Sequence, residues 1–538
     1  MPELDNFLSP AAWRGRAAVF ACLIAFPFLG FVARQQYPLL SPEVGAGLGL
    51  LVATSIALGV ICRGVVFQAA VLLVSCVSAL VPLQRELARW IHVPLGVIAA
   101  VLLVVLGLSM WRLKGRFYLA VAVFTATLLV SSLLRIGAPA HLVTAGPGDH
   151  RSGVPAHFLY LVLDEHMGPG GLPDDIEQCR VARARIERMA ARWAFTLYPN
   201  AYSNYATTFD SLTSALNGRL LQHRRALVLP PSPDAHGVYH LDTGAFRAAV
   251  ARQGYALRFI QLRSIDFTGG DDKLAFNYED SIADAGRLPG DWTDRFRLLV
   301  GRYQAADLVF ARFKGFFPFR FGLRMTFPMS AGRHWPDWLL DEIGSARRPT
   351  LFFAHVLSPH GPYMYRPDGT LRPQSEWHHD QDYERLSPSV YRDRYARYAG
   401  QVTFIQSQLH YLFAGLNARG LLEPMTVVIH GDHGSRILSQ RDGIARLNVS
   451  GPASIDRFDY AGRPDKQDLR DRFSVLLAAK RAGRGTGSID INPISLARVL
   501  PSYTGVPPLP EDPAADAAYL FDGAGKPVQI SLLDYWRP

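Results

Sequence analysis

Residues 157–168 read HFLYLVLDEHMG, and this stretch decides the fold of the second part of the chain. The run 157–163 is rich in branched and aromatic side chains without polar alternation, which is typical of a strand buried on both faces. The run ends in two acids, Asp164 and Glu165. A carboxylate at the end of a buried strand costs free energy unless it is paired or bound to a cation. Both acids are therefore candidate metal ligands, and a solvated turn or a helix cap is the alternative.

A second apolar run ends in the same manner. Residues 427–436 read VVIHGDHGSR, so a predicted strand delivers Asp432 and His433 in adjacent positions before a glycine that permits a tight turn. Oxygen and imidazole ligands side by side suit zinc or manganese, and magnesium or calcium are further options for a site with carboxylates. Arg436 follows the turn and either holds an anion or is an ordinary surface arginine.

Two more segments place reactive side chains near the ends of predicted elements. Residues 200–219 read NAYSNYATTFDSLTSALNGR, in which hydroxyl groups surround Thr207 and Thr208 at a predicted helix start. Helix capping is the alternative for these hydroxyls. Residues 352–365 read FFAHVLSPHGPYMY, and His360 lies just past a predicted strand. A structural loop histidine is the alternative for His360.

Around these segments, β-rich runs alternate with helical ones. We predict strands at 157–163, 255–262, 350–357, 425–430 and 472–478, and helices at 180–193 and 391–416. This alternation predicts an α/β domain with a mostly parallel central sheet sandwiched by helices. Ligands of such sheets bind beyond the carboxyl ends of the strands. Residues 265–345 are aromatic-rich and lack a clear pattern, so we predict an insertion there, near the site or the membrane surface.

The first quarter of the chain is strongly apolar. Five apolar segments lie at 17–33, 44–62, 64–83, 93–110 and 117–134. Each is close to the ~20 residues that span a bilayer. We predict a five-helix transmembrane domain at 1–136, a linker at 137–155 and an extracytoplasmic catalytic domain at 156–538. Basic residues in the connections place the N-terminus in the cytoplasm, so an odd number of spans puts the catalytic domain in the periplasm, with a multi-pass anchor in the bacterial inner membrane.

The formal net charge of +10 raises the question of an anionic partner. The basic residues are scattered and no nucleic-acid-binding motif accompanies them, so we predict no nucleic-acid partner and attraction to anionic lipid headgroups instead. Cysteine usage points to no disulfide in the second part of the chain. Cys179 is the single cysteine there, and the other three lie in apolar segments.

The acid pair, the hydroxyl-rich helix start, the PHGP loop and the GDHG turn together resemble the sulfatase-like branch of the alkaline phosphatase superfamily. That branch includes sulfatases, lipoteichoic acid synthases, and phosphoethanolamine and phosphoglycerol transferases, and the resemblance covers 158–480. Sulfatases carry their nucleophile ten positions before the glycine of a segment similar to SALNGR, which implies Thr208 here. The phosphoethanolamine transferases carry a nucleophilic threonine three positions before a serine that matches Ser211, which implies the same residue.

The resemblance also implies roles for the other candidates. Asp164, Asp432 and His433 match metal ligands, and Glu165 and the Thr208 hydroxyl would be further ligands. The catalytic residues would be Thr208 and His360, the latter matching a histidine that binds phosphate or protonates the leaving group. His360 and Arg436 would bind substrate.

Threonine cannot be converted to the formylglycine that sulfatases require, so the resemblance favours a transferase. We expect a phospholipid headgroup, phosphoglycerol or phosphoethanolamine, to pass through a phosphothreonine onto a periplasmic or cell-surface glycan. A phosphatase, phosphodiesterase or sulfatase-type hydrolase is the alternative, because the acid pair is closer to the paired acids of sulfatases and the disulfides usual in the transferases are missing. A third hypothesis is an inactive membrane scaffold in polysaccharide assembly.

Overall fold

The computed structural model describes part of the chain. The described residues are 13–34, 40–62, 156–220, 238–262, 265–271, 274–277, 332–372, 388–438, 444–446, 458–460, 466–508, 516–521 and 527–531, with Val71, Val104, Arg112, Phe296, Leu299 and Glu376. The chain divides into two units. The first comprises 1–144 and 280–327, and the second comprises 145–279 and 328–538.

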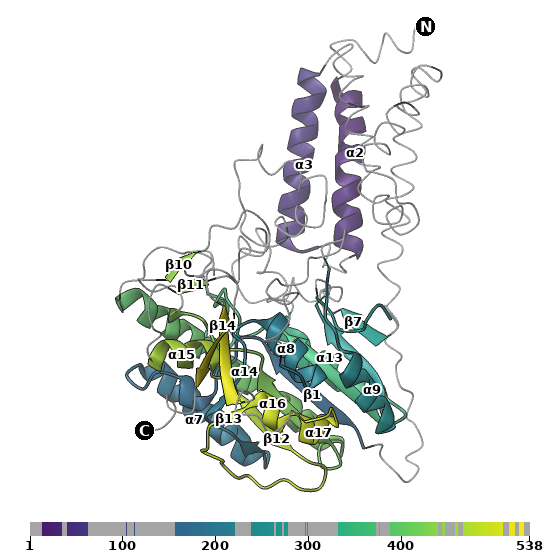
Figure 1. Cartoon of the computed structure of the whole chain (residues 1–538). Helices are drawn as coiled ribbons and strands as arrows, with labels where there is room; N and C mark the ends of the chain where they lie inside the picture. The colour runs from purple at the N-terminus through teal and green to yellow at the C-terminus, as the bar shows by residue number, and fades with distance from the viewer. Residues whose placement is uncertain are drawn as a thin grey trace. The chain divides into compact units, whose positions relative to one another are not determined.

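Two helices of the first unit, α2 (Trp13–Arg34) and α3 (Pro42–Ile61), lie side by side (Figure 1). Gly59 permits their close approach, because a Cβ atom there would lie 2.6 Å from the backbone nitrogen of Ala17. The buried Arg16 donates from Nε to the Gly59 carbonyl oxygen at 2.9 Å, so a side chain of α2 also bonds to the backbone of α3.

Among the residues that the structure describes, α3 is the one helix long and apolar enough to cross a membrane. Helices α2 and α3 cover the first two predicted apolar segments. The segments 64–83, 93–110 and 117–134 and the linker 137–155 lie outside the described residues, apart from Val71 and Val104. The five-helix membrane domain and its multi-pass topology therefore stay predictions.

The second unit is built on a seven-stranded sheet with the order β2-β12-β9-β1-β8-β5-β7. Its strands are β1 (Phe158–Leu163), β2 (Thr196–Leu197), β5 (Ala256–Gln261), β7 (Ala275–Asn277), β8 (Thr350–Val356), β9 (Thr426–Gly431) and β12 (Leu477–Lys480). Strands β9, β1, β8, β5 and β7 are parallel, whereas β12 is antiparallel to both of its neighbours. The predicted α/β domain with a mostly parallel sheet is confirmed.

Helices cover the sheet. They are α7 (Glu177–Arg192), α8 (Thr208–Asn217), α9 (Gly244–Arg252), α13 (Trp335–Ser345), α14 (Pro388–Ala418), α15 (Lys466–Phe473), α16 (Leu496–Val499) and α17 (Pro501–Thr504). One core cluster joins Tyr160 and Val162 of β1 to side chains of α8, α9 and α16. The long α14 packs against α7 and α13 instead. All six residues of β1 are buried, so both faces of this strand are covered.

Short elements complete the described part of the second unit. They are β3 (Ala201–Tyr202), β4 (Tyr239–His240), β6 (Ile265–Asp266), β10 (Ile444–Arg446), β11 (Phe458–Tyr460), β13 (Ile494–Ser495), β14 (Ala517–Phe521), β15 (Pro527–Ser531), and the 3-10 turns η3 (Pro169–Gly171) and η8 (Gly332–His334). The strands pair as β10-β11, β13-β3, β14-β15 and β4-β6.

Two predictions about this domain are wrong. The strand predicted at 472–478 is the end of α15 followed by β12 from Leu477, because Leu469 and Phe473 recur at helical spacing and bury one face of α15. The ends of the predicted insertion at 265–345 belong to the domain itself. Strand β7 forms an edge of the main sheet, and α13 packs on α14.

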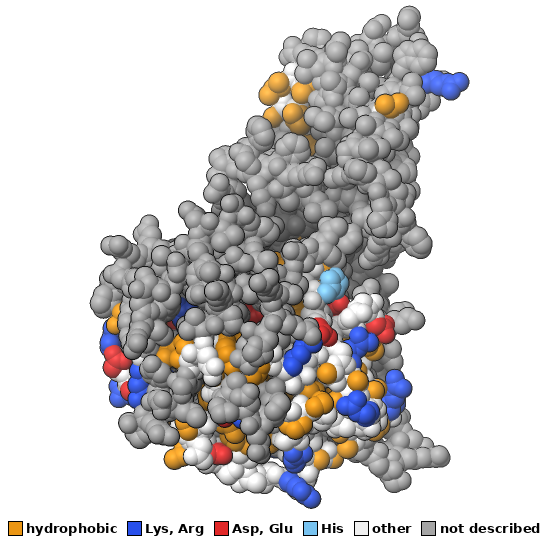
Figure 2. Space-filling view, viewed as in Figure 1, with side chains coloured by type: hydrophobic (Ala, Val, Ile, Leu, Met, Phe, Trp, Pro, Cys, Tyr) orange, Lys and Arg blue, Asp and Glu red, His pale blue; other side chains and the backbone are white. Residues whose placement is uncertain are grey.

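Basic side chains of the second unit do not gather on the face drawn in Figure 2. There, the Lys and Arg side chains of the described residues are interspersed with hydrophobic, acidic and other polar ones. Several basic side chains on the helices are also paired, such as Arg180 with Glu177 and Arg392 with Asp175. The expected lack of a nucleic-acid partner stays a prediction.

The centre of the sheet is held by aromatic packing around Phe353 of β8, which is fully buried. Its ring stacks on Tyr160 at 5.3 Å between centroids. The rings of Phe246, Phe259 and Phe267 lie at 5.9, 5.4 and 4.9 Å from it. Phe353 therefore joins three neighbouring strands and the helix layer on one face of the sheet.

We expect the substitution Phe353→Ala to lower the free energy of unfolding of the second unit by about 3–5 kcal/mol, because it leaves a cavity among four rings. Thermal unfolding of the full-length protein, followed by near-UV circular dichroism, measures the effect. The control is Ile489→Ala, since Ile489 is 56% exposed and should change stability by less than about 0.5 kcal/mol. Equal melting temperatures for the two variants would contradict the central role of Phe353.

Candidate active site

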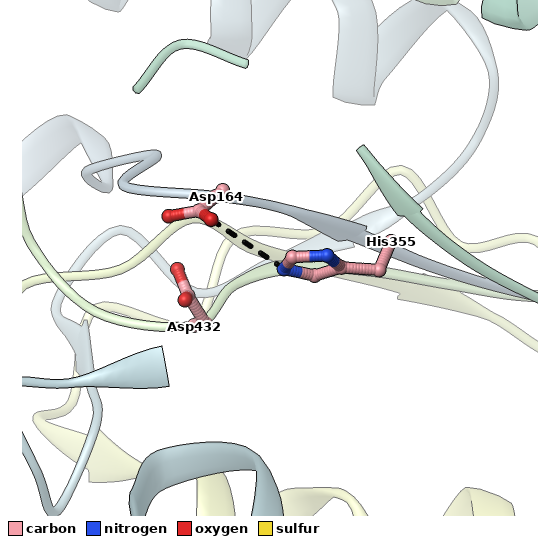
Figure 3. Close-up of side chains that lie close together, drawn as sticks. All are labelled: Asp164, His355 and Asp432. Carbon is pink, nitrogen blue, oxygen red and sulfur yellow. Dashed lines mark ion pairs between the residues drawn. The ribbon is translucent and has the colours of Figure 1, made fainter. Parts of the chain in front are cut away.

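Strand register brings three polar side chains together at the carboxyl end of the sheet. Strands β1 and β9 end as a pair, so Asp164 and Asp432 follow aligned strand ends. His355 of β8 pairs with Val162, which lies two residues before Asp164. Because side chains alternate along a strand, all three point to one side of the sheet. Figure 3 shows them directed toward one another, with His355 Nε2 at 3.5 Å from Asp164 Oδ2.

We name Asp164, His355 and Asp432 the Asp–His–Asp cluster. One ligand atom from each lies within 4.8 Å of the others. All three side chains are buried, and Asp164 Oδ1, Asp432 Oδ2 and both ring nitrogens of His355 lack a hydrogen-bond partner among the described residues. Buried polar atoms without a partner are costly. A divalent cation would bind one oxygen of each carboxylate and one ring nitrogen of His355, so the donor set fits a metal ion.

The protonation of the cluster follows from burial. Burial, and next the nearby Asp432 carboxylate, raises the pKa of Asp164 well above its usual range. Burial acts upward on Asp432 as well, but the neighbouring His433 and His355, together with the Glu165 N–H that donates to its Oδ1, lower the pKa of Asp432. Burial lowers the pKa of His355 to about 4, so its imidazole is neutral near pH 7 and keeps a lone pair for a metal.

His433 extends the cluster toward the start of α8. Its Nε2 lies 3.4 Å from Asp432 Oδ2 and 4.0 Å from Asp164 Oδ1. Its Nδ1 lies 2.8 Å from the Gly434 carbonyl oxygen, which can only accept a hydrogen bond. Nδ1 therefore carries the proton, and Nε2 accepts from the Thr208 hydroxyl at 3.3 Å.

The two threonines at the helix start have different surroundings. Thr207 is the N-cap of α8: its hydroxyl accepts from the Asp210 backbone N–H and donates to the Asp210 carboxylate. Thr208 is the first residue of the helix, and its hydroxyl faces His433 instead. The capping interpretation therefore fits Thr207, while Thr208 presents a hydroxyl beside the cluster and at the positive end of a helix dipole.

A second group of side chains lies beside the cluster. Glu165 is buried and contacts Arg436, with Oε1 at 2.5 Å from Nη2 and 3.1 Å from Nε. His360 Nε2 lies 3.6 Å from the same Glu165 oxygen. Both Glu165 and Arg436 have positive φ, 61° and 55°, a conformation that non-glycine residues rarely adopt and that commonly marks functional sites.

The structure thus places the predicted site residues in two adjoining groups. Asp164, Asp432, His433 and Thr208 meet at the cluster, whereas Glu165 faces Arg436 and His360. The alternative for Arg436, an ordinary surface arginine, is wrong, because its side chain is only 17% exposed and is paired with Glu165. The roles assigned to these residues stay predictions.

Sequence reasoning missed His355, which lies within the quoted segment 352–365. A signal for it existed: a histidine inside an otherwise apolar buried strand, one residue before the strand end. Recognising it required the pairing of Val162 with His355, which no pattern in a single sequence supplies.

Comparisons with known proteins find one matching family and several similar structures. The model of the sulfatase family matches residues 182–453, half of the chain. No curated protein matches the chain. Similar solved structures include the phosphonate monoester hydrolase of Agrobacterium radiobacter, at 14% identity over 68% of this chain and 79% of that one with a TM-score of 0.39.

Two further structures are similar at the same level. The C-terminal periplasmic domain of EcEptC from Escherichia coli is 13% identical over 71% of this chain and 94% of that one, with a TM-score of 0.38. The putative sulfatase yidJ from Bacteroides fragilis is 12% identical over 70% and 84%, with a TM-score of 0.38. At such identities and TM-scores these likenesses do not inform on the reaction.

We expect His355→Gln to weaken the binding of zinc to the metal-free protein by at least about 10-fold, because a metal donor is lost from the cluster. Isothermal titration with Zn²⁺, and in parallel with Mn²⁺, measures the change. His157→Gln is the matched control, since His157 is a buried histidine just before the amino end of β1. Equal affinities of the two variants would exclude His355 as a ligand.

Proposed function

The chain belongs to the sulfatase family, and we propose that it is a metal-dependent transferase that moves a phospholipid headgroup onto a glycan through a phosphothreonine. The observation that carries the proposal is the Thr208 hydroxyl at the start of α8, 3.3 Å from His433 Nε2 and beside two buried carboxylates. A threonine in this place suits phosphoryl transfer, because it cannot become the formylglycine of sulfate ester hydrolysis. The donor would be a membrane phospholipid carrying phosphoglycerol or phosphoethanolamine.

The proposed metal site comprises Asp164, His355, Asp432 and His433. Zinc or manganese bound there would lower the pKa of the Thr208 hydroxyl and offset the negative charge of the phosphate. Burial lowers the pKa of His433 to about 4, so this ring, like that of His355, is a neutral donor near pH 7. Glu165 holds Arg436 through Oε1, which accepts from the guanidinium, and its other carboxylate oxygen stays a candidate further ligand of the metal.

In the first step, the Thr208 hydroxyl proton passes to solvent water, and the Thr208 oxygen attacks the phosphorus of the lipid. The bond from phosphorus to the diacylglycerol oxygen breaks, and His360 supplies the proton that this oxygen takes up. Arg436 holds an oxygen of the phosphate with its guanidinium. The headgroup then remains on Thr208 as a phosphodiester.

In the second step, an acceptor hydroxyl on a periplasmic or cell-surface glycan attacks the same phosphorus. His360 takes the proton of this hydroxyl, and the Thr208 oxygen leaves and takes up a proton from solvent water. The candidate membrane helix α3 supports a site that works at a lipid surface, since donor and enzyme would share the bilayer. A multi-pass anchor in the inner membrane with the catalytic domain in the periplasm is part of the proposal.

A hydrolase is the second candidate. The acid pair Asp164–Glu165 favours it, since two adjacent acids after the first strand are similar to the acid pair of sulfatases. The same residues would act, with water in place of the glycan hydroxyl. A phosphatase or phosphodiesterase would still use Thr208, whereas a sulfatase would lack its formylglycine. The two candidates differ only in the fate of the headgroup on Thr208.

We expect the full-length protein, incubated with phosphatidylglycerol and phosphatidylethanolamine, to gain the mass of one headgroup phosphate, and we expect Thr208→Ala to gain none. Intact mass spectrometry detects the adduct, and its mass identifies the headgroup. Thr207→Asn is the matched control, because asparagine keeps the helix cap and removes the neighbouring hydroxyl, so its adduct should persist.

The remaining outcomes separate the candidates. An adduct on Thr208→Ala, or its loss from Thr207→Asn alone, would show that Thr208 is not the nucleophile. Release of diacylglycerol and free headgroup phosphate without an adduct would favour the hydrolase. A protein that binds no metal, forms no adduct and turns over no lipid would contradict both enzymatic candidates and favour an inactive scaffold.

A further inference from the structure

Three loops carry the site residues other than Thr208 and His355, and each loop follows one of three adjacent strands. The acid loop (164–167) follows β1, the histidine loop (357–362) follows β8, and the turn loop (432–438) follows β9. One helix, α14, is linked to all three loops by buried polar side chains, to two of them directly and to the turn loop through Asp471. These side chains are Tyr395, Tyr398 and Gln401, which lie three residues apart and therefore on one side of the helix.

Tyr398 bonds to the backbone of the acid loop at two points. Its hydroxyl donates to the Glu165 carbonyl oxygen at 2.8 Å and accepts from the Met167 N–H at 2.8 Å. These two bonds hold the backbone on either side of His166, where the chain turns after Asp164. Since Glu165 has a φ of 61°, such a conformation persists only where surrounding contacts hold it.

Gln401 bonds to the histidine loop in the same manner. Its Nε2 donates to the carbonyl oxygens of Pro359 and His360 at 3.0 and 3.2 Å. Its Oε1 accepts from the Tyr365 N–H at 3.1 Å. One amide side chain therefore satisfies three backbone groups around His360, and an apolar residue in its place would leave them buried without partners.

Tyr395 reaches the turn loop through Asp471. Its hydroxyl donates to Asp471 Oδ1 at 2.6 Å, and the same oxygen accepts from Ser435 Oγ at 2.5 Å. Asp471 Oδ2 accepts from the Leu438 N–H at 2.8 Å. The backbone is close here too, since a Cβ on Gly434 would lie 2.0 Å from the Asp471 carbonyl oxygen. The turn after Asp432 and His433 is thus tied to α14 through one carboxylate.

The order of these contacts along α14 matches the order of the strands in the sheet. Tyr395, Tyr398 and Gln401 serve the loops after β9, β1 and β8, and the sheet order is β9-β1-β8. A three-residue step along a helix advances about 4.5 Å. Neighbouring strands lie roughly 4.8 Å apart. The rise over three helical residues is therefore close to the spacing of neighbouring strands. Side chains at this interval on one face of a helix can each bond near a successive strand end.

We propose that Tyr395, Tyr398 and Gln401 are positioning residues that make α14 a common support for the three loops and so set the distances within the metal site. This inference rests on the contacts of the loops and not on the transfer reaction. A fourth polar residue, Gln406, contacts the ring of His166 at 3.1 Å, but it bonds to a side chain and not to the loop backbone.

A common support differs from three separate local supports in one measurable respect. If α14 couples the loops, removal of one contact disturbs all three. If each contact acts alone, the disturbance stays in its own loop. The distinction can be made without turnover, since backbone amides in each loop accept deuterium at rates that report local opening.

The experiment compares full-length protein with Tyr398→Phe by hydrogen–deuterium exchange and by titration of the metal-free protein with Zn²⁺ alone. We expect faster exchange in all three loops and a loss of Zn²⁺ affinity of about 10–100-fold, as for residues that orient metal ligands. Tyr411→Phe is the matched control on the same helix, because its hydroxyl donates to Asp337 and contacts none of the loops.

A second pair of variants repeats the comparison and decides the matter if Tyr398→Phe does not fold. Gln401→Glu removes the donor to the histidine loop, and Gln408→Glu is its control, since Gln408 bonds to Arg333 and Trp335. Faster exchange confined to the loop that lost its contact, or exchange equal to that of the control, overturns the proposal. If no adduct forms on Thr208, the proposed transfer reaction fails, but the hydrogen–deuterium exchange and the Zn²⁺ titration still test the support by α14.

Discussion

Backbone pairing of β1 with β8 and β9 holds three strand ends level, and the site depends on this alignment. A one-residue slip of β8 would turn His355 to the opposite face of the sheet, because side chains alternate along a strand. A similar slip of β9 would remove Asp432 from Asp164. Asp164 and Asp432 are buried carboxylates that repel each other when both are ionised. Bringing them together therefore lowers the stability of the fold unless a cation is bound between them. The arrangement is therefore better understood as a requirement of function than as a source of stability.

Much of the fold could be predicted from the sequence, and the reason is local. Uninterrupted apolar runs ending in Asp164 and Asp432 indicate buried parallel strands and the edge at which polar groups gather. Elements that depend on tertiary context could not be predicted. The chain from Arg472 to Ala478 is apolar enough for a strand, yet its first part completes α15, because Leu469 and Phe473 pack on Tyr202 and Ala518.

The site was predictable to the same extent. Residues adjacent in sequence to strand ends could be found from their type, and Thr208 could be distinguished from Thr207 only with a family resemblance. His355 and the Glu165–Arg436 contact could not be found in this manner, because each joins segments distant in the chain, the latter at a separation of 271 residues. Partners across a sheet are set by register and by loop conformation, and a single sequence encodes neither in a visible pattern.

The long helix α14 has a geometric limit. Adjacent strands of a sheet are rotated by roughly 20–25° relative to each other, so the line of strand ends curves away from any straight helix. A helix that matches three strand ends closely must depart from a fourth. The chain after β5 accordingly stabilises its own turn: the Phe267 N–H donates to Gln261 Oε1 at 3.0 Å, and the Thr268 N–H to Asp266 Oδ1 at 2.8 Å. The twist of the sheet thus sets how many strand ends one straight helix can hold, and the segment after β5 reaches the site by ring packing instead, since the Phe267 ring lies 5.4 Å from the ring of His355.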